Sequence, residues 1–129
     1  IMPVDTIVEE NNKVMEKDIN ELTNDSIIYD IGSKTINKYA RIIESARTIF
    51  INGTMGLYED ERFENGTKEI LQNISKSEFV KIAGGGDALA SIEKFNIKNF
   101  DYKSTGGGAT LEYIKTGKLN CMNWQNCDN

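Results

Sequence analysis

The sequence contains no histidine, and this absence excludes more chemistry than any other feature of its composition. Ser-His-Asp and Cys-His nucleophile activation, zinc held by histidine, and acid–base catalysis by imidazole all need that side chain. Cysteine is scarce too: Cys121 and Cys127 form a single C-x5-C pair, which matches no common zinc pattern. A disulfide between them stays open, although two free thiols in a reducing cytosol are favoured.

Long apolar runs and basic clusters are also missing. The longest stretch without a charged side chain, residues 48–58, has 11 residues, whereas a membrane span needs about 20. The 15 basic and 20 acidic side chains give a net charge of -5 and are spread along the chain, so an electrostatic footprint for nucleic acid is absent. We therefore expect partners that include neither membrane nor nucleic acid.

A chain of 129 residues can form at most one domain, and a hydrophobic content of 39% is ordinary for a folded domain with a core. Nothing near the beginning of the chain resembles a secretory signal. The chain opens with Ile1 and Met2 in a strand-like run that lacks a polar leader. We expect it to be a piece of something longer.

Apolar spacing predicts strands that alternate with helices through the second half of the chain. A good N-cap, Ser33, opens the clearest helix, in which Ile36, Tyr39 and Ile43 recur at helical spacing. Residues 11–25 predict at most a short ribbon. The other helices are expected at 66–75, 87–95 and 109–115, and the strands at 4–9, 48–52, 79–83 and 102–105. This order predicts an α/β fold, with a mostly parallel sheet covered by helices on both faces.

The chain contains one internal repeat. Residues 79–86 align with residues 101–108 at an offset of 22, and both segments end in three glycines before a helix. Two copies are too few for a solenoid, so they indicate neighbouring β/α units of one sheet.

The two glycine triplets predict an anion site. Three consecutive glycines cost backbone entropy, which indicates that something must approach the bare backbone closely. At the carboxyl end of a parallel sheet, the N-terminus of each following helix offers free N–H groups to phosphate. The alternative is a pair of tight turns with left-handed residues. Neither triplet is a G-x-G-x-x-G fingerprint or a P-loop, because no G-K-[ST] follows.

Asp87 and residues 52–59 extend this expected site. Asp87 follows the first triplet, where it can cap the helix or hold Mg²⁺ on a bound nucleotide, and the neighbouring anion sites favour the metal. Residues 52–59 leave the strand at 48–52 and combine apolar and small residues with a carboxylate. Such a loop suits a purine and a ribose, although it is more often structural.

Four segments in order resemble phosphoglycerate kinase, in the later part of its C-terminal, nucleotide-binding domain. They are Asp30-Ile31-Gly32-Ser33-Lys34-Thr35, residues 52–59, Gly84-Gly85-Gly86-Asp87, and Ser104-Thr105-Gly106-Gly107-Gly108-Ala109. The opening Pro3-Val4-Asp5 is similar to the strand that precedes them in the family. The likeness covers residues 1–118, whereas the tail at 119–129 differs from the usual family ending.

The resemblance implies a role for each matching residue. Those expected to bind the nucleotide are Asn52, Gly53, Thr54, Leu57, Glu59, Gly84, Gly85, Gly86 and Asp87, with Glu59 on the ribose hydroxyls and Asp87 on the nucleotide-bound magnesium. Those expected to meet the transferring phosphoryl group are Thr105, Gly106, Gly107 and Gly108. Two positions depart from the family pattern: Thr54 replaces the usual proline, and Ala88 replaces a hydroxyl residue that assists phosphate binding.

The resemblance also implies that much of the enzyme is missing. The family's N-terminal domain, which binds 3-phosphoglycerate, and the early part of its C-terminal domain are absent. In the family's strand order, 3-2-1-4-5-6, this chain supplies strands 3, 4, 5 and 6 of an incomplete, three-layer, Rossmann-like domain. The missing domain or a companion chain is therefore an expected partner.

The implied function is reversible phosphoryl transfer between 1,3-bisphosphoglycerate and ADP with Mg²⁺, in the cytoplasm. This chain would supply the Mg-nucleotide side and would be inactive alone. The alternative is a catalytically silent nucleotide-binding or structural fragment.

Overall fold

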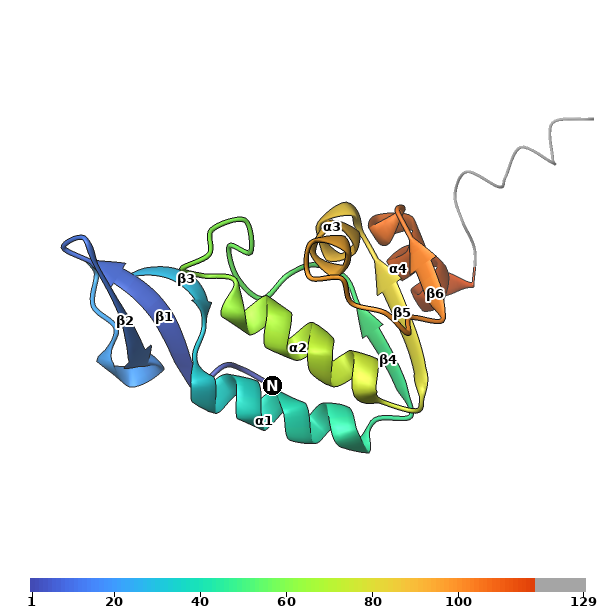
Figure 1. Cartoon of the computed structure of the whole chain (residues 1–129), viewed down its shortest axis with the longest axis horizontal. Helices are drawn as coiled ribbons and strands as arrows, with labels where there is room; N and C mark the ends of the chain where they lie inside the picture. The colour runs from blue at the N-terminus through green and yellow to red at the C-terminus, as the bar shows by residue number, and fades with distance from the viewer. Residues whose placement is uncertain (118–129) are drawn as a thin grey trace, which may run out of the picture.

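The strands form two separate three-stranded sheets rather than one. The computed structural model describes residues 1–117. It therefore does not describe the tail at 119–129, which includes Cys121 and Cys127. The first half carries an antiparallel sheet in the order β2-β1-β3, and the second half a parallel sheet in the order β4-β5-β6 (Figure 1). The strands are β1 (Asp5–Glu10), β2 (Lys13–Asp18), β3 (Ile27–Ile31), β4 (Thr48–Ile51), β5 (Val80–Gly84) and β6 (Tyr102–Ser104).

The expectation that the first strand belongs to the parallel sheet is wrong. β1 pairs antiparallel with β2 on one side and with β3 on the other. Asn11 and Asn12 both have positive φ angles, 49° and 61°, and they close the β1–β2 hairpin in two residues. Such a turn matches the twist of antiparallel strands and so fixes this pairing locally.

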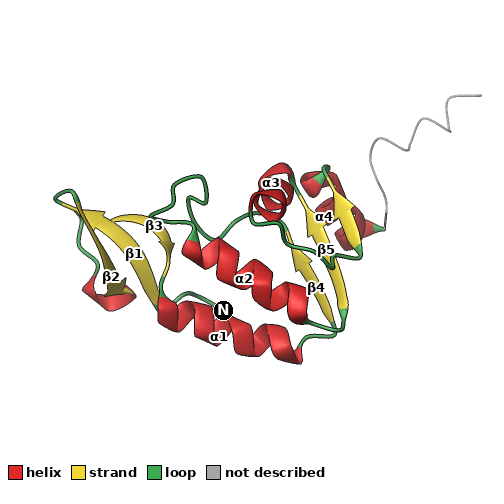
Figure 2. Cartoon of the chain, in the orientation of Figure 1, coloured by secondary structure: helices red, strands yellow, loops and turns green. Residues whose placement is uncertain are grey.

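The helices lie between and around the two sheets, as Figure 2 shows in red. They are α1 (Ser33–Ser45), α2 (Asn65–Lys76), α3 (Gly86–Lys94) and α4 (Gly107–Thr116), with a short 3-10 turn, η1, at Ile19–Glu21. No helix in residues 1–117 has the length and hydrophobicity to cross a membrane.

The helix α1 begins at Ser33, but its cap comes from another element. Gly32 occupies the N-cap position. The carboxylate of Asp5 on β1 accepts hydrogen bonds from the N–H groups of Lys34 and Thr35 at 2.8 and 2.7 Å. Ser33 instead donates its own N–H and hydroxyl to Glu16 on β2. The cap thus fastens α1 to the antiparallel sheet.

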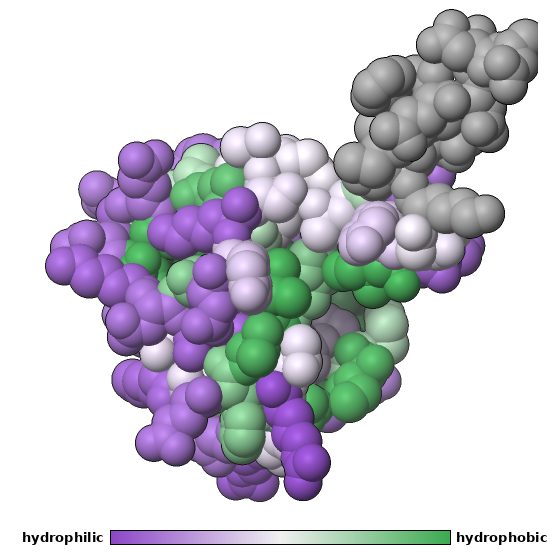
Figure 3. All heavy atoms as spheres, turned by 90° about the vertical axis from the view of Figure 1, so that its right-hand side faces the viewer, coloured by the Kyte–Doolittle hydropathy of each residue, from purple (hydrophilic) through white to green (hydrophobic). Residues whose placement is uncertain are grey.

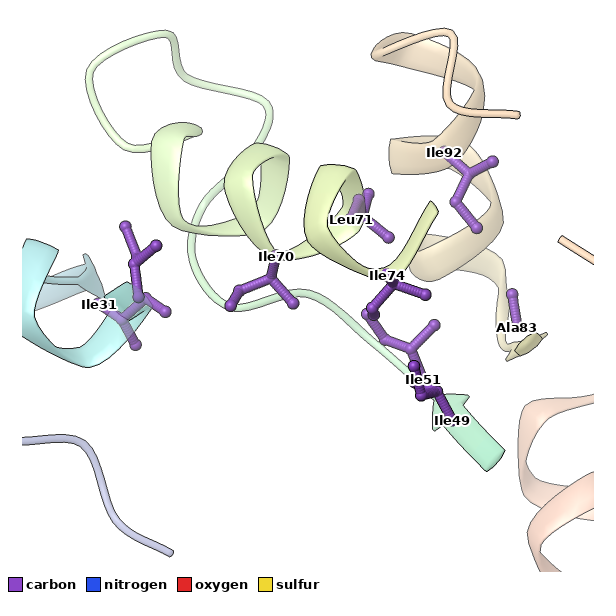
Figure 4. Packing of buried hydrophobic residues seen from close by; sticks show 9 residues of the cluster. Ile31, Ile49, Ile51, Ile70, Leu71, Ile74, Ala83 and Ile92 are labelled. Carbon is purple, nitrogen blue, oxygen red and sulfur yellow. The ribbon is translucent and has the colours of Figure 1, made fainter. Parts of the chain in front are cut away.

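One hydrophobic core joins α1 and α2 to one face of the parallel sheet, the face that carries Ile49, Ile51 and Ala83. It also includes Ile31 at the end of β3 and Ile92 on α3, and Figure 4 shows these side chains converging between the elements. The buried cluster consists of Ile31, Ile36, Ile49, Ile51, Ile70, Leu71, Ile74, Ala83 and Ile92. This core fixes the parallel sheet beneath α2 and α3.

The second face of the parallel sheet is only partly covered in residues 1–117, contrary to the expectation of helices on both faces. Side chains alternate along a strand, so Phe50, Val80 and Tyr102 do not share the face of Ile51 and Ala83. Val80 is 44% exposed and Tyr102 is 67% exposed. Figure 3, which faces the right-hand side of the molecule in Figure 1, shows apolar residues at the surface on that side.

Candidate functional site

The parallel register brings three segments to the same edge of the sheet. Ile51 pairs with Ala83, and Gly84 pairs with Ser104. The residues that follow these strands therefore leave side by side, at the carboxyl ends where open α/β sheets bind ligands. These residues are Asn52 after β4, Gly85 after β5 and Thr105 after β6.

Asn52 lies between the two glycine segments. A Cβ atom at Gly85 would lie 3.0 Å from Asn52 Oδ1, and one at Gly84 would lie 3.3 Å from it. A Cβ at Gly107 would collide with the same oxygen and would lie 2.7 Å from Gly85 Cα. The N–H of Gly85 donates to the Ser104 carbonyl at 2.9 Å. The glycines are therefore needed for two loops and the Asn52 amide to share this space.

Two helix N-termini point into this region without capping side chains. Gly85 is the N-cap of α3, and its φ of 91° favours glycine. Gly106 is the N-cap of α4. Because the first N–H groups of a helix have no intrahelical partner, these two ends together can bind an anion. Gly86 and Gly108 are exposed, so their backbone is accessible.

Asp87 lies in the first turn of α3 and is exposed. Its carboxylate has no hydrogen bond or ion pair with any of residues 1–117, so the cap role considered from the sequence finds no contact to support it. The chain has no cluster of three or more metal-ligating side chains within residues 1–117. Asp87 is thus a single free carboxylate, which suits a cation that carries most of its ligands on a nucleotide.

The segment at residues 53–59 borders the same region. Burial chiefly raises the pKa of Tyr58, and the negative charges of Glu59 and Asp87 raise it further. Leu57 is 42% exposed, and Glu59 is exposed as well. Neither Leu57 nor Glu59 has a hydrogen bond to the glycine loops in the part of the chain that the structure describes.

Backbone contacts hold this segment in place from behind. Leu57 N–H donates to the Tyr29 carbonyl on β3 at 2.8 Å, and Met55 N–H donates to Thr67 Oγ1 on α2 at 3.0 Å. Lys94 Nζ, in the last turn of α3, donates to the Tyr58 carbonyl at 2.6 Å. The segment is thus attached to β3, α2 and α3.

Asp30 is a buried residue that supports the candidate site from behind. The sequence places it in the matching segment 30–35 but gives it no separate role. Its carboxylate accepts the N–H groups of Gly66 at 2.7 Å and Ile31 at 2.8 Å, and burial raises its pKa despite these bonds. A Cβ at Gly56 would lie 2.6 Å from Asp30 Cγ. Asp30 therefore caps α2 and packs behind the segment at residues 53–59. The sequence shows only a carboxylate one residue before the end of a strand. The N–H group that it binds belongs to Gly66, 36 residues away along the chain, so local spacing does not reveal the contact.

The two positions that depart from the family pattern differ in burial. Thr54 is partly buried in the loop. Ala88 is fully buried, so its methyl group packs inside the protein rather than facing the exposed glycine loops.

Comparison with known proteins connects this arrangement to one family. The family model described as phosphoglycerate kinase matches residues 1–118. The phosphoglycerate kinase of Wigglesworthia glossinidia brevipalpis is 43% identical over 124 residues, and that of Vibrio campbellii is 44% identical over 112 residues. The solved phosphoglycerate kinase of Coxiella burnetii is 40% identical and superposes with a TM-score of 0.85.

The matches cover nearly all of this chain but only about a third of each relative. The shares are 92% of this chain and 32% of the Wigglesworthia protein, 86% and 29% for the Vibrio protein, and 95% and 33% for the Coxiella structure. The chain belongs to the phosphoglycerate kinase family and spans about a third of its relatives' length.

Proposed function

We propose that this chain is the Mg-nucleotide side of a phosphoglycerate kinase, with residues 1–118 forming part of the C-terminal domain and residues 119–129 a tail. One observation carries the proposal: Asn52, Gly85 and Gly107 meet at the carboxyl edge of the parallel sheet, beside two helix N-termini. That edge is where an α/β sheet receives a nucleotide.

The nucleoside would lie along residues 52–59. Asn52, Gly53 and Thr54 would border it, Leu57 would offer an exposed apolar contact, and Glu59 would accept hydrogen bonds from the ribose hydroxyls. The exposure of Leu57 and Glu59 supports this placement, because both side chains are free to meet a ligand.

The phosphates would lie between the two glycine segments. Gly84, Gly85 and Gly86 would hold them at the start of α3. Thr105 and residues 106–108 would face the transferring phosphoryl group at the start of α4. Backbone N–H groups held in place before the reaction stabilise the charge that builds up during transfer, without reorganising.

Asp87 would hold the magnesium ion that accompanies the nucleotide. When bound, Mg²⁺ neutralises phosphate charge and aligns the phosphoryl oxygens for transfer. Without a cation, the carboxylate of Asp87 would repel those phosphates. Its exposure and its lack of a protein partner fit this role.

The reaction would be reversible transfer of a phosphoryl group between 1,3-bisphosphoglycerate and ADP, in the cytoplasm. The acyl-phosphate side would come from the missing two thirds of the enzyme, on the same chain or on a companion chain. A silent nucleotide-binding or structural fragment is the second candidate. The observation that favours it is coverage, because the chain spans only about a third of the length of its relatives.

A chimeric kinase tests the proposal. Residues 1–118 of this chain would replace the matching third of the Coxiella burnetii kinase, which is 40% identical. We expect turnover from ATP and 3-phosphoglycerate. A chimera that folds and binds MgADP but never turns over would favour the silent candidate. One that folds without binding MgADP would contradict the nucleotide site itself.

A further inference from the structure

Lys94 joins α3 to the loop that connects β4 with α2. It is the last residue of α3. Its ammonium nitrogen donates to the carbonyl of Tyr58 at 2.6 Å and lies 2.8 Å from Glu64 Oε2. A lysine carries three N–H donors on a long stem, so it can bind two acceptors from different parts of the chain at once. Lys94 therefore fastens the C-terminal end of α3 to this loop.

The bond to the Tyr58 carbonyl is more than a surface ion pair. Tyr58 is 8% exposed, and Lys94 is the only donor to its carbonyl within residues 1–117. Without that donor, the carbonyl would be an unpaired acceptor in buried surroundings. The pair with Glu64 is more open to solvent, since the two side chains are 34% and 21% exposed, and open ion pairs contribute little. The contact that holds the loop is therefore the one with the backbone.

The Tyr58 carbonyl belongs to the peptide group that leads into Glu59. A peptide group is planar, so a bond that holds its oxygen also orients the Cα atom of the next residue. The Glu59 side chain is exposed and has no hydrogen bond or ion pair within residues 1–117. The N–H of Asp60 donates to the Leu57 carbonyl at 3.1 Å, which closes a turn with Tyr58 and Glu59 at its corner. The place of Glu59 therefore depends on what holds this turn.

Asp87 and Lys94 lie on the same face of α3. They are seven residues apart, close to two full turns of helix, so their side chains project in nearly the same direction. The rise of an α-helix separates them by about 10 Å along its axis. Asp87 is the carboxylate proposed for magnesium, and Lys94 holds the turn that carries Glu59, the carboxylate proposed for the ribose. One helix thus sets the distance between the phosphate and ribose parts of the site.

We propose that Lys94 is a positioning residue, which holds Glu59 at the distance from the glycine loops that the ribose of a bound nucleotide requires. Through this contact the site prefers a nucleotide with free ribose hydroxyls. The inference rests on the proposed function and adds the residue that connects its nucleoside and phosphate parts. The alternative is a purely structural lysine, whose loss would weaken every ligand of the site alike.

Two matched ligands test the proposal. The full chain of 129 residues would be titrated calorimetrically with MgADP and with the magnesium complex of dideoxy-ADP, which lacks both ribose hydroxyls. We expect the unaltered chain to bind the dideoxy ligand about tenfold more weakly or worse, because hydrogen bonds to a carboxylate are strong.

Lys94→Met removes the donor and keeps a side chain of similar length. We expect this variant to bind MgADP about tenfold more weakly and to change its affinity for the dideoxy ligand by less than about twofold. The preference for the ribose hydroxyls would then be lost, although the hydroxyls themselves are unchanged. A purely structural lysine would not produce this difference between the two ligands.

Three further variants separate positioning from stability. Lys94→Arg keeps a charged donor and should restore most of the preference. Glu64→Gln removes the ion pair but leaves the Tyr58 bond, so we expect MgADP affinity to change by less than about twofold. Lys98→Met is the matched control, because Lys98 is exposed and has no hydrogen bond or ion pair within residues 1–117. It should bind both ligands as the unaltered chain does.

Amide hydrogen exchange examines the contact without any ligand. In the free chain, we expect Lys94→Met to speed exchange of the Asp60 N–H, which closes the turn, by about tenfold. Lys98→Met should leave that exchange rate unchanged. Equal rates in the two variants would show that Lys94 does not hold the turn and would overturn the proposal.

The binding results distinguish this proposal from the proposed function. If the unaltered chain prefers MgADP, the proposal fails when Lys94→Met keeps that preference, weakens both ligands equally or behaves like Lys98→Met. The nucleotide site then still stands. If the unaltered chain binds both ligands equally or binds neither, the placement of the nucleoside on Glu59 is wrong, and the role of Lys94 fails with it.

Discussion

Gly107 is the residue at which the two glycine segments come closest. A Cβ there would lie 2.7 Å from Gly85 Cα and 2.8 Å from Gly85 N, and it would also collide with the Asn52 amide oxygen. Backbone atoms cannot move aside as a flexible side chain can. The spacing of the loops after β5 and β6 therefore depends on the absence of a side chain at Gly107.

We expect Gly107→Ala to destabilise the chain by about 1–3 kcal/mol, the usual cost of forcing an extra carbon into a packed position. The next residue is a matched control, because a Cβ at Gly108 meets nothing within 4 Å. Gly108→Ala should be neutral or stabilising by up to about 1 kcal/mol, since alanine favours helix. Urea unfolding of both variants measures the difference. Equal stabilities would contradict the close approach.

Asp87 offers a second residue-scale test, which separates a helix cap from a group that positions the metal. In the completed, chimeric kinase, we expect Asp87→Asn to lower kcat by about 100-fold, as when one fixed electrostatic group is lost from a transition state. The melting temperature should hardly change, because Asp87 has no partner within residues 1–117. The measurement is kcat at saturating MgATP beside thermal unfolding. An unchanged kcat would exclude the metal role.

The meeting of the two glycine loops could be predicted from the sequence because its signals are local, whereas the binding roles of the individual residues stay predictions. Two triplets at a fixed offset predict two equivalent loops, and parallel strands bring such loops together. The supporting residues could not be found this way. Asp30 binds the N–H of Gly66, which is 36 residues away along the chain. Lys81 and Lys103 align in the repeat, yet their burial differs: Lys81 is 6% exposed, whereas Lys103 is exposed. Such differences depend on tertiary packing.

At the scale of elements, helix caps supplied by distant carboxylates attach α1 and α2 to the antiparallel sheet. Asp5 on β1 caps α1, and Asp30 on β3 caps α2. A carboxylate at a helix N-terminus satisfies free N–H groups and complements the helix dipole. The antiparallel sheet therefore holds both helices at their N-terminal ends.

The Asp5 cap predicts a pH dependence. Burial by itself would raise the Asp5 pKa, but hydrogen bonds with Thr35, Glu16 and Lys34 together outweigh it and hold the pKa below its ordinary value of 3.8. A lowered folded-state pKa gives stability that is present above 3.8 and is lost as the pH falls through the folded-state value. We expect Asp5→Asn to cost about 1–2 kcal/mol at pH 7 and progressively less below pH 3.8.

Chemical unfolding of both proteins between pH 7 and pH 3 measures this difference. Asp30, whose raised pKa acts in the opposite direction, is common to both proteins, so its contribution cancels from the comparison. What remains is the contribution of Asp5 together with its neighbour Glu16. Asp25→Asn, at an exposed position, serves as the control and should show no such trend. A cost for Asp5→Asn that stays constant with pH would contradict the cap.

Element types could be predicted wherever the apolar spacing was regular. The spacing of Ile36, Tyr39 and Ile43 predicted α1, and the strand–glycine–helix order predicted β5, α3, β6 and α4. The strand at residues 4–9 and a short ribbon within residues 11–25 were expected and correspond to β1 and β2. The strand β3 was missed, because Ile27 and Ile28 are adjacent apolar residues and give no alternation. The antiparallel pairing of β1 with β2 depends on the positive φ angles at Asn11 and Asn12, a turn signal that apolar spacing does not contain.

At the scale of the whole molecule, the candidate site occupies one edge of the parallel sheet. Within residues 1–117, that edge carries two helix N-termini without capping side chains and the exposed carboxylate of Asp87. The chain spans about a third of its relatives' length, so the proposed function takes the site of the other substrate from outside these residues.

We therefore expect the isolated chain to show no phosphoryl transfer from ATP to 3-phosphoglycerate, even at saturating Mg²⁺. Adding the complementary Coxiella piece should restore transfer, because positioning of both substrates supplies most of the rate acceleration. A coupled assay of ADP release, with and without that piece, measures this. Asp25→Asn in the same mixture should keep the restored rate, since Asp25 is exposed on the antiparallel half of the chain.

Each result of this assay distinguishes the kinase proposal from the alternative of a silent fragment. Transfer by the isolated chain would contradict the assignment of the acyl-phosphate site to the missing part. Formation of a complex without any transfer would identify the chain as the silent fragment. Restored transfer that disappears with Asp87→Asn but not with Asp25→Asn would show that the glycine loops of this chain take part in the chemistry, because Asp87 lies at the start of α3 beside them.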